Sequence, residues 1–280
     1  MGTEVDEGSR YDDIADGYAR WWGPVIAPAA LALLDRVAGA LGDATDVIDV
    51  GTGTGTLALA ALERWPQLRI AGVDGSAEMA ALADAEADRR WRGTARARFR
   101  TIVALADRIP LEAATADVVI SSFVYQLVPS RHRALVDARR LLRPGGTIGY
   151  VTWLRGGPPS AVDAVVDEVF ERFGFDPREP DLRPGELASP AAAATGLRRA
   201  GFRAARAEPG MLEHRWGPTE IVGFLEHFDE TSTFDELEAA ARTDLRATLL
   251  ERVAGLSEDD RALRMPVVYA TARAGGRGPR

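Results

Sequence analysis

Three glycines spaced two residues apart, Gly51, Gly53 and Gly55, lie between an apolar run and a helical pattern. Glycine lets the chain turn sharply and lets a ligand approach the backbone without a Cβ in the way. The amides at the start of the following helix then point at the ligand. The third glycine comes one position too early for the dinucleotide-binding G-x-G-x-x-G pattern, because position 56 is threonine. The spacing therefore favours a ligand with an amino-acid carboxylate over one with a pyrophosphate.

An acidic residue, Asp74, ends the next apolar run, 23 residues after Gly51. A carboxylate at that strand end can accept hydrogen bonds from both hydroxyls of a ribose. The alternative is a helix cap, because Asp74-Gly75-Ser76 opens a helical pattern. The strand–loop–helix context on both sides favours the ribose role.

Apolar runs alternate with helical patterns along the chain, which is typical of a parallel α/β sheet. The patterns predict strands at 46–50, 68–73, 97–102, 117–121, 147–152, 202–214 and 267–272. They predict helices at 56–65, 77–89, 131–142, 162–173, 219–228 and 234–253. Arg143-Pro144-Gly145-Gly146 is a helix-stop signal before the fifth strand.

The amino-acid composition of the chain excludes some kinds of site and argues against some partners. The chain has no cysteine and three histidines, so disulfides and thiolate metal sites are excluded, and we expect no catalytic metal. A net charge of −8 argues against nucleic acid as a partner, because phosphate binding needs a basic face. The basic cluster at 89–100 is interpreted as a solvated helix end.

No apolar run reaches the ~20 residues of a membrane span. The start of the chain is acidic and polar, so we expect a cytoplasmic protein.

With these motifs in order, the sequence resembles the class I S-adenosylmethionine-dependent methyltransferases, in particular the branch that acts on small molecules. The resemblance lies in five segments: Tyr11-Asp12-x-x-Ala15-x-x-Tyr18, Val47 to Gly55, Gly72-Val73-Asp74-x-Ser76-x-x-Met79, Asp117 to Ser122, and Arg140 to Gly146. It implies a Rossmann-like, seven-stranded, mostly parallel sheet with an antiparallel last strand and helices on both faces. An N-terminal lid and a small helical cap would complete a single methyltransferase domain over 1–280. Its expected parts are lid helices (1–42), a cofactor-binding core (43–153), a cap insertion (154–187), the rest of the sheet with cap helices (188–272) and a tail (273–280).

The resemblance also implies a cofactor site for S-adenosylmethionine. Asp49 would lie near the methionine ammonium, the glycine loop would hold the methionine part, and Asp74 would bind the ribose. Met79 would pack on the adenine or belong to the helix core. The full set of expected cofactor-binding residues is Tyr11, Tyr18, Asp49, Gly51, Thr52, Gly53, Asp74, Gly75, Met79, Leu105, Ala106, Ser121, Ser122 and Gln126.

Two positions in this site stay open. Gln126 could contact either the cofactor or the acceptor. Leu105 stands where the family usually has an aspartate for the adenine amino group; either Asp107 replaces it, or backbone and apolar contacts hold the ring beside Ala106. We favour the second, because Asp107 lies two residues after the position at which the family has its aspartate.

The expected reaction is methyl transfer to an O, N or C nucleophile of a small-molecule metabolite. His214 is the candidate base, by its position after the sixth strand, although a surface histidine at the strand end is the favoured interpretation. The aromatic residues Trp21, Trp22, Trp153, Trp216 and Phe224 indicate an apolar acceptor or, as readily, core packing. The alternatives are an S-adenosylmethionine-binding protein with other chemistry and a nicotinamide-dependent reductase. The last is disfavoured because the chain has no lysine for a Tyr-x-x-x-Lys pair.

Overall fold

One sheet organises the molecule. The computed structural model describes residues 12, 14–176, 178 and 185–275, and seven strands within them form a sheet of order β3-β2-β1-β4-β5-β7-β6. The strands are β1 (Asp46–Val50), β2 (Arg69–Asp74), β3 (Phe99–Val103), β4 (Ala116–Ser122), β5 (Leu142–Trp153), β6 (Phe202–His214) and β7 (Leu263–Ala274). β1 to β5 are parallel, and β7 runs antiparallel between β5 and β6. The expected sheet with its antiparallel last strand is confirmed.

Helices cover both faces of this sheet. One face packs against α2 (Gly23–Arg36), α3 (Ala38–Asp43), α4 (Thr56–Arg64) and α5 (Ala77–Arg90), and the other against α7 (Arg131–Leu141) and α9 (Pro190–Arg199). Within β4, Val118 and Ile120 face the first layer, whereas Val119 faces the second. Both faces are buried, which explains why the central strands are continuous apolar runs rather than alternating ones. A short helix, α6 (Gly93–Arg96), precedes β3.

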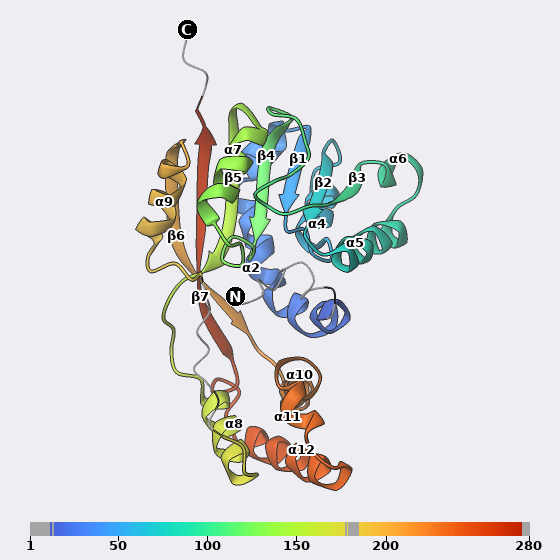
Figure 1. Cartoon of the computed structure of the whole chain (residues 1–280), viewed down its shortest axis with the longest axis vertical. Coiled ribbons are helices and arrows are strands. Elements are labelled where there is room, and N and C mark those ends of the chain that lie inside the picture. Colours follow the sequence, from blue (N-terminus) through green and yellow to red (C-terminus); the bar gives the residue numbers. More distant parts are fainter. Residues whose placement is uncertain (1–11, 13, 177, 179–184, 276–280) are drawn as a thin grey trace, which may run out of the picture.

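A helical cap lies beyond the carboxyl ends of the parallel strands (Figure 1). It contains α8 (Ala161–Arg172), α10 (Pro218–Phe224), the π-helical turn η2 (Leu225–Asp229), α11 (Thr231–Asp235) and α12 (Ala239–Ala254). These helices share a hydrophobic core of their own, which includes Phe170, Phe234 and Leu249. The outer parts of β6 and β7 reach the cap as a two-stranded arm, because β5 pairs with β7 only as far as Trp153 and Val267. A second π-helical turn, η1 (Tyr18–Trp22), lies between the sheet and the cap.

Several predicted boundaries differ from the structure, and two of the differences have a structural consequence. The helix expected at 234–253 is divided into α11 and α12. Phe234 and Leu245, on either side of the break, are both fully buried in the cap core. In addition, β5 begins at Leu142, directly after α7, and the Arg-Pro-Gly-Gly segment forms an irregular stretch within this strand, with a register shift against β4 and a φ angle of 82° at Gly145.

The Arg-Pro-Gly-Gly segment has a structural role. Arg143 donates to Asp117 at 2.7 Å and to Asp46 at 2.9 Å, which joins the amino ends of β1, β4 and β5. A Cβ on Gly146 would lie 2.9 Å from the Asp117 carbonyl oxygen, so glycine is needed for this close approach. These contacts lie at the edge of the sheet opposite the carboxyl ends.

The basic segment at 89–100 is partly neutralised. Arg90 pairs with Glu86 and Glu63, and Arg96 pairs with Asp84 and Asp88. The interpretation of this segment as a solvated, ion-paired helix end therefore agrees with its contacts.

Candidate functional site

The glycine loop between β1 and α4 is packed closely on one side and open on the other. Gly51, Gly53 and Gly55 all have positive φ angles, of 70°, 52° and 85°. A Cβ on Gly51 would lie 1.9 Å from a methyl carbon of Val124, whereas a Cβ on Gly53 would meet nothing within 4 Å. The loop is thus held against the connection after β4, and it leaves open space beside Gly53.

Asp74, at the end of β2, fixes the glycine loop from the side. Its Oδ2 accepts a hydrogen bond from the Gly53 amide at 2.7 Å, and its Oδ1 accepts one from the Ser76 amide at 3.0 Å. Ser76, not Asp74, caps α5, because the Ser76 hydroxyl accepts from the Met79 amide at 3.0 Å. Burial raises the pKa of Asp74, while the amide hydrogen bonds oppose this effect. The carboxylate has further lone pairs that can accept from a ligand.

Behind the loop lies a buried carboxylate. Asp49 is 1% exposed, and its Oδ2 accepts from the Thr52 hydroxyl at 3.0 Å. Its Oδ1 is buried and has no hydrogen-bond partner among the described residues. Burial raises the pKa of Asp49 to about 7. An unpaired buried carboxylate oxygen is costly, so this position is suited to a cationic partner.

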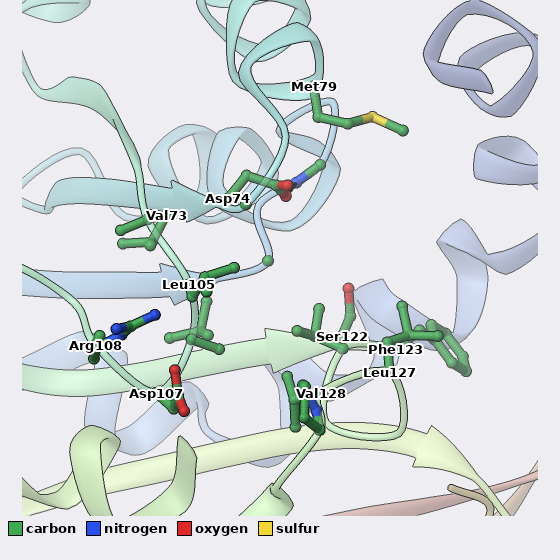
Figure 2. A pocket seen from close by; sticks show the side chains of 18 of the residues that line it. Val73, Asp74, Met79, Leu105, Asp107, Arg108, Ser122, Phe123, Leu127 and Val128 are labelled. Atoms are coloured by element: carbon green, nitrogen blue, oxygen red, sulfur yellow. Dashed lines mark hydrogen bonds between the residues drawn. The ribbon is translucent and has the colours of Figure 1, made fainter. Parts of the chain in front are cut away.

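These elements line one pocket of about 460 Å³ at the carboxyl ends of β1, β2 and β4. Figure 2 shows Asp74 and Met79 on one side of it and Ser122, Phe123, Leu127 and Val128 on the other, with Leu105, Asp107 and Arg108 along a third side. The expected residues that line the pocket are Tyr18, Gly51, Gly53, Asp74, Gly75, Met79, Leu105, Ala106 and Ser122.

Other expected residues lie outside the pocket lining. Asp49 and Thr52 are buried behind the glycine loop, and Ser121 donates to the Val50 carbonyl at 2.8 Å inside the sheet. Gln126 is buried: its amide donates to the Phe123 carbonyl at 2.7 Å and accepts from the Thr152 hydroxyl at 2.5 Å. Gln126 thus supports the loop after β4 rather than facing a ligand. Tyr11 lies outside the described residues.

His214 ends β6, in the two-stranded arm, and its ring lies edge-on to Trp216 with centroids 5.1 Å apart. Burial lowers its pKa. The structure does not bring it into the pocket lining. Among the described residues, no group of three acidic, histidine or cysteine side chains is placed to hold a metal ion.

Sequence reasoning missed several pocket residues on the connections after β3 and β4. Arg133, from α7, pairs with Asp107 at 2.7 Å, and both line the pocket. Asp107 is therefore engaged by an arginine at the pocket wall. The sequence predicted Phe123 at the start of the connection after β4. The rest of this connection, up to Pro129, could have been predicted too, because it leaves a central strand at the carboxyl edge, where ligands of open α/β sheets bind.

Asp12 was also missed as a site-forming residue, although it lies inside the first motif. Its carboxylate accepts from the Ser76 hydroxyl at 2.5 Å and from the Glu78 amide at 3.2 Å. Both hydrogen bonds lower the pKa of Asp12. The N-terminal segment is thus attached to the start of α5, two residues beyond Asp74.

The fold and the pocket define the class of protein. A mostly parallel seven-stranded sheet carries a glycine loop after its first strand and an acid after its second, and both open into one pocket. Residues 47–146 match the protein family described as "Methyltransferase domain".

Named relatives agree with this family match. The chain is 37% identical over 121 residues to a trans-aconitate 2-methyltransferase from Azoarcus sp. (strain BH72), a segment that covers 43% of each protein. It is 33% identical over 109 residues to a ubiquinone/menaquinone biosynthesis C-methyltransferase from Syntrophotalea carbinolica, covering 39% of this chain and 44% of that one. The matches thus span less than half the length of these curated relatives.

Among solved structures, the [4+2]-cyclase SpnF has a TM-score of 0.63 at 18% identity, with 97% of each chain covered. This likeness concerns the fold alone. The family match and the relatives confirm the resemblance to the class I S-adenosylmethionine-dependent methyltransferases.

Proposed function

We propose that this protein transfers a methyl group from S-adenosylmethionine to an O, N or C nucleophile of a small-molecule metabolite, such as a natural-product intermediate. The observation that carries the proposal is the junction of the glycine loop and Asp74 at 2.7 Å on the wall of one pocket. It brings a backbone loop suited to an amino-acid group next to a carboxylate suited to a ribose.

The residues present fit this cofactor. The unpartnered Oδ1 of Asp49 suits the methionine ammonium, and the open side of Gly53 leaves room for the carboxylate. Asp74 keeps lone pairs for the ribose hydroxyls. Met79, Val73 and Leu105 provide apolar surface beside Asp74 for the adenine. Asp107 is paired with Arg133, which supports adenine binding through apolar and backbone contacts near Ala106.

When bound, S-adenosylmethionine supplies a methyl group already activated by its positive sulfur. The contribution of the chain is then alignment and exclusion of water. Alignment of reacting groups can account for ~7–11 kcal/mol of a barrier, and a closed site prevents competing hydrolysis. Ser122 and Phe123, at the end of β4, line the part of the pocket nearest Trp153, whose ring centroid lies 4.2 Å from that of Phe123.

Proton removal from the acceptor is a separate question. None of the described residues that line the pocket is a histidine. If His214 is nevertheless the base, His214→Gln should lower kcat for S-adenosylhomocysteine formation about 100-fold, the scale of general-base catalysis. We expect a change of less than about threefold, because His214 lies outside the pocket. His132→Gln, on α7, is the matched control.

We further propose that the chain works as a single domain with the lid, core and cap boundaries expected from the sequence. No helix in the described part of the chain is both long and apolar enough to cross a bilayer. A cytoplasmic location stays a prediction.

Calorimetry and product analysis test the proposal. S-adenosylhomocysteine should bind to the wild-type protein and NADH should not; the reverse would favour a nicotinamide-dependent reductase. Because a [4+2]-cyclase shares the fold, cofactor binding alone does not establish methyl transfer. Formation of S-adenosylhomocysteine together with a product heavier by one methylene unit is the required result. Cofactor binding without such a product for any acceptor in a broad metabolite panel would favour repurposed chemistry.

A further inference from the structure

Aromatic side chains from the lid, the sheet and the cap meet at one end of the pocket. Phe123 lines the pocket, and its ring centroid lies 4.2 Å from that of Trp153, at the end of β5. Trp153 lies 6.3 Å from Trp22 of η1, and Trp22 lies 5.8 Å from Phe224 of α10. We call these four residues the aromatic wall. It runs without a break from the pocket to the cap.

The charged residues of the pocket lie elsewhere. Asp107 and Arg108 come from the connection after β3, and Figure 2 shows them across the pocket from Phe123. Arg133 is already paired with Asp107 at 2.7 Å. The end of the pocket that continues into the aromatic wall therefore presents rings and aliphatic groups, and it suits an uncharged ligand better than a polyanion.

Phe123 is held at the wall in an unfavourable backbone conformation. Its φ angle is +56°, in the left-handed region that bulky side chains rarely adopt. Its carbonyl accepts from Gln126, and Gln126 in turn accepts from Thr152, the residue before Trp153. Its amide donates to the Val151 carbonyl at 2.9 Å. Backbone strain of this kind persists only where the surroundings enforce it, and it concentrates at ligand sites.

The wall also lies between two hydrophobic cores. Trp22 and Trp216 are partly buried and pack against both the sheet core and the cap core. The lid and the cap are fitted to each other through glycines: a Cβ on Gly223 would lie 2.6 Å from Trp21, and one on Gly17 would lie 3.1 Å from Phe228. The turn η1 and the cap are therefore closely packed on each other, and the aromatic wall lies where both meet the sheet.

We propose that the methyl acceptor is a planar, uncharged ring compound that binds at the Phe123 end of the pocket and stacks on the aromatic wall. Aromatic rings favour offset stacking on other flat π systems, which gives a wall of this kind both affinity and orientation. The inference rests on the proposed function, because it assigns the acceptor class of the same site.

Equilibrium binding to the protein loaded with S-adenosylhomocysteine tests the inference. The probes are 2-naphthol, which is planar, uncharged at pH 7 and carries a hydroxyl nucleophile, and trans-aconitate, a tricarboxylate. The variants are Trp153→Leu and Trp22→Leu, neither of which alters a residue assigned to cofactor binding. Trp65→Leu, at the end of α4, is the control for the same chemical change away from the site.

We expect the wild-type protein to bind 2-naphthol at least tenfold more tightly than trans-aconitate. Each wall variant should weaken 2-naphthol binding at least fivefold while its Kd for S-adenosylhomocysteine changes less than twofold, which also shows that it is folded. Trp65→Leu should change neither constant. Tighter binding of trans-aconitate, no 2-naphthol binding to the loaded protein, or equal 2-naphthol affinity in the wild type and both wall variants would overturn the inference. Failure of the wild-type protein to bind S-adenosylhomocysteine would instead contradict the proposed function.

Discussion

The pocket has a donor end, at the glycine loop and Asp74, and an acceptor end, at the aromatic wall. The two ends are built in different ways. At the donor end, backbone amides and short polar side chains hold each other at hydrogen-bond distance, as in the 2.7 Å contact between Gly53 and Asp74. At the acceptor end, large rings from η1, β4, β5 and α10 pack together, and a backbone turn is held in place from behind by Gln126.

This difference follows from what each end has to recognise. The donor end binds the same cofactor whatever the acceptor is. A few residues close together in the sequence can therefore form it, each at a closely defined position. The acceptor end depends on side chains far apart in the sequence, whose contacts are apolar and less directional. Substitutions at the donor end should therefore have large and specific effects, whereas those at the acceptor end should be graded.

The largest effect is expected at Gly51. Gly51→Ala places a Cβ 1.9 Å from Val124 and adds a side chain at φ +70°. The strain and the overpacking together should lower the free energy of unfolding by about 2–5 kcal/mol, measured by urea denaturation. Gly53→Ala has the same kind of φ angle but open space, and it should cost only about 1–2 kcal/mol. Equal losses in the two variants would show that packing against the loop after β4 does not matter.

Asp74→Asn should weaken binding of S-adenosylhomocysteine about 10- to 100-fold, because hydrogen bonds to a charged group contribute ~1.5–3 kcal/mol. Isothermal titration calorimetry measures this change. Asp107→Asn is the comparison within the same pocket, and it should change affinity less than about threefold, since its pair with Arg133 is partly exposed. A larger loss in Asp107→Asn than in Asp74→Asn would assign the adenine amino group to Asp107.

Asp49 should make the donor end sensitive to pH. Its pKa is about 7 in the cofactor-free fold, against a reference value of 3.8. Between these values the unfolded chain loses the proton and the folded chain keeps it, so the free energy of unfolding falls as the pH rises from about 4 to 7. Asp49→Asn should lack this fall, as measured by denaturation at pH 4.5 and pH 7.5.

Binding should change in the opposite sense. The methionine ammonium needs the ionised carboxylate, so the affinity of the wild type for S-adenosylhomocysteine should rise between pH 5.5 and pH 7.5. Asp49→Asn should bind weakly at both values. A wild-type affinity that does not change over this range would contradict the assignment of Asp49 to the ammonium.

A smaller effect is expected where the N-terminal segment meets the donor end. Asp12→Asn weakens the contact with Ser76 and Glu78, and we expect the dissociation rate of S-adenosylhomocysteine to rise about threefold by stopped-flow measurement. Asp16→Asn, an exposed residue of the same segment, should leave the rate unchanged. If both variants behave alike, the attachment through Asp12 has no role in cofactor retention.

The donor end was foreseeable from the sequence because it is local. Gly51, Gly53 and Asp74 lie at the ends of consecutive strands, and parallel strands bring their carboxyl ends to one edge. Ser121 and Gln126 lie in the same region, but whether a side chain faces the pocket or the interior depends on the register of β4 and the path of the loop after it. Those features depend on the packed structure.

The sequence by itself determined the order of the strands and of most helices, the donor loop and the acid that accompanies it, because periodicity and glycine spacing act over short distances. It did not predict α9. Only the tertiary structure decided the position of the cap at the end of the β6–β7 arm. The same is true of the division of 234–253 into two helices and of which ring lies at the pocket. These depend on contacts such as Trp22 with Phe224, about two hundred residues apart, and no local pattern encodes such a pairing. For the same reason, the donor could be inferred from motifs, whereas the acceptor had to be inferred from packing.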